Sequence, residues 1–99
     1  MVTAAKRPPA YRADKEALLK RLRRIEGQVR GVERMVEEER YCVDILTQIS
    51  AVQAALDKVA LALLDEHTRH CVVGARTAKD RDEKTGEMME AVGRLLRSR

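Results

Sequence analysis

Apolar residues recur at alternating spacings of three and four along most of the chain, which is the pattern of amphipathic helices that pack along one face. One such segment predicts a helix over residues 15–38, with an apolar stripe formed by Leu18, Leu22, Ile25, Val29, Val32 and Val36. A second predicts a helix over residues 41–73, with the stripe Cys42, Ile45, Ile49, Val52, Leu56, Val59 and Leu63. A third, over residues 80–97, presents Met88, Val92, Leu95 and Leu96. We therefore predict an all-α protomer of three helices.

The second predicted helix is too long for one neighbouring helix to cover its apolar sides. At a rise of about 1.5 Å per residue it extends for about 50 Å. Residues 39–41 form a very short link, so the first two helices are expected to make an antiparallel hairpin. Two hairpins cover each other as an antiparallel four-helix bundle, and a symmetric homodimer is the economical solution. A higher oligomer is compatible with the same pattern.

Composition limits the chain to one small domain. Its 99 residues are 44% apolar and 36% charged, which is too apolar for a disordered chain. Residues 1–13 have the character of a flexible basic tail, ahead of a single domain over residues 14–99. We find no apolar leader and expect no apolar run of membrane-spanning length, so we predict a cytoplasmic protein with reduced thiols. Its two cysteines are then core residues, metal ligands or redox groups.

His67 and Cys71 are four residues apart and share one face of the second predicted helix, which allows both to bind one metal ion. Each alone has a plainer interpretation, as a solvated histidine and as a small core residue. Counting 100° per residue, Cys42 lies about 20° from both around the helix axis, but about 40 Å away along it. One chain cannot join the three, whereas an antiparallel copy of the helix brings the partner's Cys42 to this pair.

This pairing gives two identical sites per dimer, each across the subunit interface. The two helices would cross near residues 55 and 56, where Ala51, Ala54 and Ala55 are expected to permit close approach. Two thiolates and one imidazole suit Cu(I), at one ion per protomer, because Cu(I) accepts a small set of soft ligands. Structural Zn(II) would require a fourth ligand. His70 points about 100° away from Cys71, so we do not expect it to bind the metal.

Three motifs give the chain a resemblance to a known family. The stretches "RRIEGQVRG", "YCVDILTQISAV" and "HTRHC" occur in register, and the chain from about Ala17 to its C-terminus resembles the CsoR/RcnR family of bacterial metal-sensing repressors. The resemblance implies an all-α dimer that pairs into a tetramer and has no helix-turn-helix. It also implies that the metal-free form binds operator DNA and releases it when the effector binds.

Branches of that family differ at the sensing positions. The copper branch has Cys, His and Cys, which correspond here to Cys42, His67 and Cys71. The nickel/cobalt branch has His in place of the last Cys and uses an N-terminal His, and a persulfide-sensing branch lacks the central His. The resemblance also implies an outer shell, with Tyr41 and Glu87 at the matching positions. We expect His67 to bind copper through one ring nitrogen and to reach Tyr41 or Glu87 with the other.

Basic residues on the first predicted helix suggest a polyanionic partner. The net charge is +4 and the isoelectric point is about 9.4, which alone is a weak signal. The alternative is a solvated face whose arginines pair with Glu26, Glu33 and Glu37. The resemblance assigns operator contacts to Arg21 and Lys58. We therefore expect double-stranded DNA to contact this basic set, namely Arg21, Arg23, Arg24, Arg30 and Lys58.

The sequence predicts a Cu(I)-responsive transcriptional repressor, with two alternatives left open. One is a copper-buffering protein without DNA function, and the other is a repressor that senses thiol oxidation or persulfides through Cys42 and Cys71. A copper chaperone is a further expected partner. No constellation of nucleophile, base and orienting residue is found, so we do not expect an enzyme.

Overall fold

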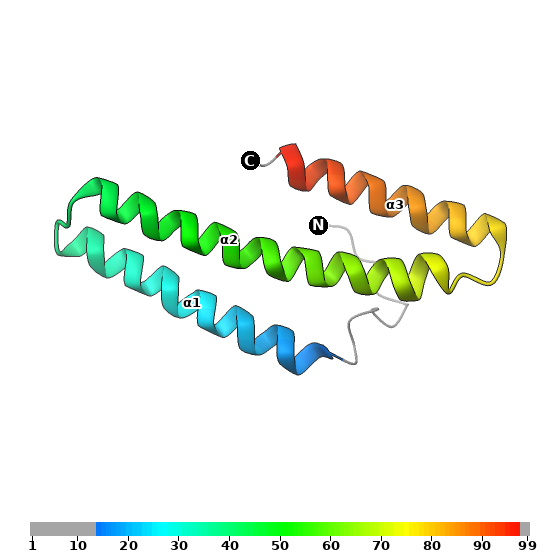
Figure 1. The fold of residues 1–99 in the computed structure, drawn as a ribbon, viewed down its shortest axis with the longest axis horizontal. Coiled ribbons are helices and arrows are strands. Elements are labelled where there is room, and N and C mark those ends of the chain that lie inside the picture. The colour runs from blue at the N-terminus through cyan, green and yellow to red at the C-terminus, as the bar shows by residue number, and fades with distance from the viewer. Residues whose placement is uncertain (1–13, 98–99) are drawn as a thin grey trace. The chain divides into compact units, whose positions relative to one another are not determined.

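The computed structural model describes residues 14–97 of the chain and forms them into helices (Figure 1). In order these are α1 (Lys15–Glu37), α2 (Cys42–His67), a π-helical segment η2 (Thr68–Val73) and α3 (Ala78–Arg97). The described residues contain no strand, which confirms the predicted all-α, three-helix protomer. The predicted basic tail over residues 1–13 lies outside the described part. Contacts within the chain divide the described residues into two units, one from Asp14 to Leu61 and one from Ala62 onward.

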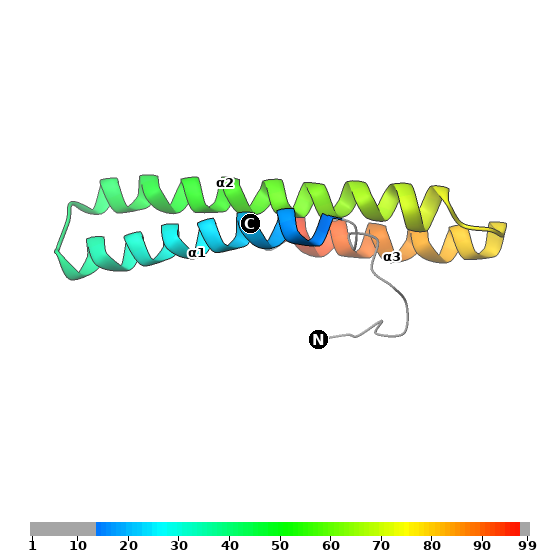
Figure 2. The same cartoon turned by 90° about the horizontal axis from the view of Figure 1, so that it is seen from below.

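The first unit is a hairpin of α1 and the N-terminal part of α2. The two helices lie side by side in both views (Figures 1 and 2), as the short link between them predicted. Its buried apolar side chains are Leu18 and Ile25 on α1, two turns apart, and Val59 on α2. All three belong to the predicted stripes. Such a small buried set leaves most of the apolar surface of the hairpin uncovered.

The turn between α1 and α2 closes with the hydrogen bonds of a Schellman motif. The backbone N–H of Arg40 donates to the Met35 carbonyl at 3.0 Å, and that of Glu39 donates to the Val36 carbonyl at 3.0 Å. Glu39 takes the left-handed conformation that the motif requires, with a φ of 54°. Glycine usually fills this position, because a side chain there crowds the following carbonyl.

The second unit contains the end of α2, η2 and α3. Thr77 caps α3, since its Oγ1 accepts a hydrogen bond from the Asp80 backbone N–H at 3.0 Å. This cap starts the helix at Ala78, two residues before the predicted start at residue 80. Lys84 faces inward on α3 and is 7% exposed, while its ammonium group pairs with Asp80 at 3.1 Å.

The apolar character of α2 corrects one prediction. The stretch Cys42–Val73 is long and apolar enough to pass a length-and-composition test for a membrane span, although no such run was expected. Core helices of soluble proteins pass the same test, so the result is weak evidence for a membrane. It shows how much apolar surface α2 carries. Many of its large side chains are exposed in the single chain, among them Val43, Leu46, Ile49, Leu56, Leu61 and Leu63.

The left-handed residue Glu39 generates a stability prediction. Replacing it by glycine removes the steric cost of the positive φ, and this gain exceeds the larger unfolded-state entropy of glycine. We expect Glu39→Gly to raise the free energy of unfolding by about 0.5–1 kcal/mol. Urea denaturation followed by circular dichroism measures the change. Glu38→Gly serves as the control and should destabilise, because Glu38 has a negative φ of -84°.

Candidate metal centre

The helix that carries the predicted ligands changes its hydrogen-bonding pattern between them. A continuous α-helix was predicted to residue 73, but the α-helix ends at His67 and Thr68–Val73 is π-helical. In a π-helix each backbone N–H bonds to the carbonyl five residues earlier instead of four, so each turn holds more residues. Cys71 lies in this wider turn and His67 directly precedes it. The change alters the direction of Cys71 relative to His67, and short π-helical turns of this kind occur often at functional sites.

Gly74 ends the π-helical segment. A methyl group placed on Gly74 would lie 2.9 Å from the backbone carbonyl oxygen of His70, which is closer than side chains approach such atoms. The glycine is therefore required by the close approach of the last turn of η2 to the chain that leaves it. The sequence suggested Gly74 as a helix stop, and the structure adds this steric reason.

His67 is half-buried and its ring reaches the backbone of α3. Its Nε2 lies 3.4 Å from the carbonyl oxygen of Lys84, at the long end of hydrogen-bonding distance. A carbonyl only accepts, so this contact favours the tautomer with the proton on Nε2 and leaves the lone pair of Nδ1 for a metal ion. The expected outer-shell partners are both exposed in this structure, Tyr41 at 68% and Glu87 on α3. Their role stays a prediction.

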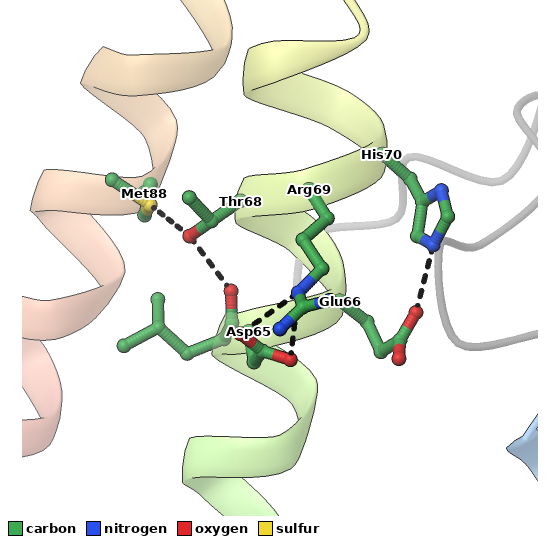
Figure 3. A network of polar contacts seen from close by, with 7 residues as sticks. Asp65, Glu66, Thr68, Arg69, His70 and Met88 are labelled. Carbon is green, nitrogen blue, oxygen red and sulfur yellow. Dashed lines mark hydrogen bonds and ion pairs between the residues drawn. The ribbon is translucent and has the colours of Figure 1, made fainter.

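Thr68 forms a second link between η2 and α3. Its hydroxyl lies 2.9 Å from the Leu64 carbonyl and 3.2 Å from the sulfur of Met88, and its single proton serves one of them at a time (Figure 3). Met88 and Lys84 are one turn apart on α3. The consecutive residues His67 and Thr68 therefore contact two neighbouring turns of α3. Sequence reasoning missed both Thr68 and the main chain of Lys84, although a threonine beside the predicted ligand His67 was a visible signal.

The other ionisable side chains near the pair are engaged with each other. His70 Nε2 lies 3.0 Å from a carboxylate oxygen of Glu66, and Arg69 pairs with Asp65 at 3.2 Å (Figure 3). The His70 ring thus points toward Glu66 one turn earlier on the same helix. This arrangement supports its exclusion from the predicted ligand set.

The two thiols are free and lie in different units. Cys42 is exposed at the first residue of α2, and Cys71 is half-buried in η2. Over residues 14–97 the structure gathers no group of three His, Cys, Asp or Glu side chains able to hold a metal ion. The predicted donors nevertheless fit a soft metal ion by their chemistry, since a half-buried thiol, a second free thiol and an imidazole are ligands that Cu(I) prefers.

A groove between α1 and α2 contains three of the predicted DNA-binding residues. It has a volume of about 700 Å³ and lies within the first unit. Its lining is Arg21, Arg24, Ile25 and Gln28 from α1, and Ala51, Ala54, Ala55, Lys58 and Leu61 from α2. Arg23 and Arg30 do not line it. Gln28 was not singled out from the sequence as a DNA contact, although it lies within the motif "RRIEGQVRG".

The salt-bridged face that was the alternative to DNA binding is not found. In the part of the chain described, none of the arginines of α1 forms an ion pair with Glu26, Glu33 or Glu37, and Lys58 is also without one. Among residues 14–97, the cations lining the groove therefore form no close ion pair with a carboxylate.

The alanines predicted to lie at the helix crossing instead line the groove with α1. At 100° per residue, the lining residues of α2 are centred about 160° around the axis from Cys42. Ala51, Ala54 and Ala55 therefore face away from the side on which Cys42 lies. Their position beside α1 therefore does not support the small-residue contact expected between two copies of α2, and the crossing near residues 55 and 56 stays a prediction.

Comparison with known proteins identifies the family. A family model described as metal-sensitive transcriptional repressor matches residues 14–94. The chain belongs to this family. This confirms the resemblance seen in the sequence motifs, and it makes the chain a member of a family of transcriptional repressors.

Individual relatives of the chain within this family are described by the metal they sense. The chain is 54% identical over 90 residues to the copper-sensing transcriptional repressor RicR of Mycobacterium tuberculosis, covering 89% of this chain and 94% of the relative. It is 49% identical to the copper-sensing transcriptional repressor CsoR of Bacillus subtilis, covering 86% of this chain and 84% of the relative. Among solved structures it resembles the copper-sensing repressor CsoR with Cu(I) from Geobacillus thermodenitrificans, with a TM-score of 0.78 and 44% identity over 97% of this chain and 94% of that one.

The close approach at Gly74 predicts opposite effects for two glycine substitutions. Gly74→Ala forces the added methyl group against the His70 carbonyl, so we expect a loss of about 1–2 kcal/mol in the free energy of unfolding. Gly86 on α3 has nothing within 4 Å of the same position, so Gly86→Ala should stabilise by about 1 kcal/mol. Chemical denaturation measures both, and hydrogen exchange localises the first to η2. A Gly74→Ala protein as stable as Gly86→Ala would show that the approach is not tight.

Proposed function

We propose that this family member is a Cu(I)-responsive transcriptional repressor, which binds operator DNA in its metal-free form and releases it when Cu(I) binds. The proposal rests mainly on the donor set. His67 and Cys71 lie on one short segment, and a second thiol is exposed at Cys42. These are soft ligands in a number that suits Cu(I). The names of the similar copper-sensing repressors support the same metal.

The complete site requires a second copy of the chain. Within about 40° of Cys42 around α2 lie Leu46, Ile49 and Leu56, which are 59%, 37% and 45% exposed. An apolar face of this kind needs a cover, and an antiparallel second copy of α2 provides one while placing Cys42 beside the partner's pair. Each dimer then has two sites, with one Cu(I) per protomer. Pairing of dimers into a tetramer is part of the proposal through the family.

Release of DNA follows from linkage between the two ligands. If the DNA-free conformation binds Cu(I) 100 times more tightly, DNA binding is weakened by the same factor, about 2.7 kcal/mol. His67 is placed to transmit the change, because its Nε2 contacts the main chain of α3 while Nδ1 is available for the metal. The predicted reach of His67 to Tyr41 or Glu87 in the metal-bound form would replace that contact. The proposed function requires no catalytic step, so we do not propose an enzyme. Because the proposed repressor acts on DNA, we propose that it works in the cytoplasm.

DNA binding is assigned to the cations of α1 and α2. Arg21, Arg24 and Lys58 surround one groove and are unpaired within residues 14–97. Arg23 and Arg30 remain proposed contacts outside that groove. Phosphate contacts by such residues release counterions, so operator affinity should fall steeply with salt. A copper chaperone as the source of Cu(I) also remains a proposal.

A mixing experiment tests the site shared between subunits. Anaerobic titration of the wild-type protein should give one tight Cu(I) per protomer, and Cys42→Ser and Cys71→Ser alone should each give none. A dimer formed from one of each variant keeps one intact site, because the first supplies His67 and Cys71 and the second supplies Cys42. Random equal mixing after unfolding should therefore restore about 0.25 Cu(I) per protomer. Mixtures that restore nothing would contradict a shared site.

The role of His67 separates copper sensing from the two alternatives. A DNA duplex is first selected by the metal-free wild-type protein from a random library. We expect His67→Ala to bind this duplex normally and to be retained when Cu(I) is added, since one of three ligands is lost. Gel shift or fluorescence anisotropy measures release. If a persulfide releases both proteins while Cu(I) releases neither, thiol sensing is correct. If no duplex is selected, the copper-buffering alternative is correct.

A further inference from the structure

We infer that the sugar–phosphate backbone of DNA enters the groove between α1 and α2 and contacts its alanine floor, instead of passing over the cationic rim. The inference rests on the proposed repressor function and assigns its DNA contact to a defined cavity. It also gives roles in DNA binding to three residues that were not among the predicted DNA contacts, namely Gln28, Ala51 and Ala54.

The groove has cations on both sides and little bulk at its base. Arg21 and Arg24 are contributed by α1 and Lys58 by α2, so positive charge faces the cavity from both helices. Ala51 and Ala54 are exposed and line the same 700 Å³ volume. Longer side chains at these positions would fill it. Because the side chains at the base are short and cations lie on both sides, the groove is deep enough for an anionic chain to enter and be bound by these cations.

The position of the groove argues against a second copy of the protein as its occupant. The exposed apolar side chains near Cys42 lie about 160° away around α2 from the centre of the groove lining. A copy that covers the Cys42 side therefore leaves the groove accessible. Three unpaired cations would also oppose a second basic chain, whereas they attract a polyanion.

The other lining groups match the chemistry of a nucleic-acid backbone. Phosphate oxygens accept hydrogen bonds from arginine and lysine, and side-chain amides such as that of Gln28 donate to phosphates or base edges. Leu61, which is 62% exposed, provides apolar contact for the deoxyribose. Gly31 lies two turns from Arg24 on the same side of α1 and carries no side chain that would hold DNA away from the helix. A methyl group added to Gly31 would have nothing within 4 Å, so the space beside it is open. DNA can thus come close to the helix.

The test changes the depth of the groove while keeping its charge. Ala54→Leu and Ala51→Leu add bulk at exposed positions of a helix that tolerates leucine well. The matched controls are Ala54→Ser, which stays small, and Ala91→Leu, which adds the same bulk at an exposed alanine of α3. Arg21→Ala and Lys58→Ala serve as charge-removal references. Affinity is measured on the duplex selected by the wild-type protein over a series of salt concentrations, together with Cu(I) stoichiometry and oligomeric mass.

We expect each leucine variant to lose about tenfold or more in DNA affinity, while Ala54→Ser and Ala91→Leu bind like wild type. The charge references should also weaken binding and lower the salt slope by about 0.9 for each phosphate that is no longer neutralised. Copper stoichiometry and oligomeric mass should not change in any variant. If Ala54→Leu binds DNA with wild-type affinity while Arg21→Ala binds it more weakly, the DNA contacts the cations without entering the groove.

Two further outcomes would also overturn the inference, and they identify which part fails. A changed oligomeric mass in Ala54→Leu would show that a copy of the chain occupies the groove. Wild-type affinity in Arg21→Ala and Lys58→Ala as well would remove the DNA contact from this surface and with it that part of the proposed function. The release of DNA by Cu(I) from the wild-type protein is measured separately, so the repressor function can stand while the groove assignment fails.

Discussion

The apolar surface of α2 is the constraint on which the rest of the structure depends. The helix is 26 residues long and only Val59 among its side chains is buried in the single chain. Exposing side chains such as Leu46, Ile49 and Leu56 to water costs about 25 cal/mol for each Å² of apolar surface that a partner could cover. A chain of this design therefore reaches its stable form by association, and its functional groups have to be arranged around surfaces that association covers or leaves open.

The two proposed functions use different sides of that helix. Cys42 lies on the side with exposed leucine and isoleucine, where a second copy would shield a metal site from water. The alanines and Lys58 lie on the far side, in a groove that is also lined by Arg21 and Arg24 of α1. This separation explains how one short helical protein could hold a soft metal ion at an interface and still present cations to DNA. It also explains why the groove needs small residues, since α2 itself forms its floor.

Much of the fold could be predicted from the sequence, because periodicity and capping are local signals. The expected helix over residues 15–38 is observed as Lys15–Glu37, and the third helix differs at its start by two residues because the Thr77 cap was overlooked. The donor residues could be proposed from the sequence because His67 and Cys71 are unusual neighbours at helical spacing, and their role stays a prediction. The π-helical turn could not be predicted, since apolar spacing is nearly the same in both helix types over one turn. The groove could not be predicted either, because it depends on how α1 packs against α2.

Contacts with α3 give a physical reason why the chain departs from α-helical geometry after His67. His67 reaches the carbonyl of Lys84, and Thr68 reaches the sulfur of Met88, so two consecutive residues meet two turns of α3. In this position Lys84 is buried, which costs free energy because its charge loses contact with water. The ion pair with Asp80 offsets part of that cost. The Nε2 contact fixes how the His67 ring lies against α3 and leaves Nδ1 for the proposed metal ion, so a metal bound at Nδ1 would act on α3 through this ring. If His67 and Cys71 hold Cu(I) as proposed, the main-chain contact of His67 would couple metal binding to α3, and the wider turn of η2 would set the direction of Cys71.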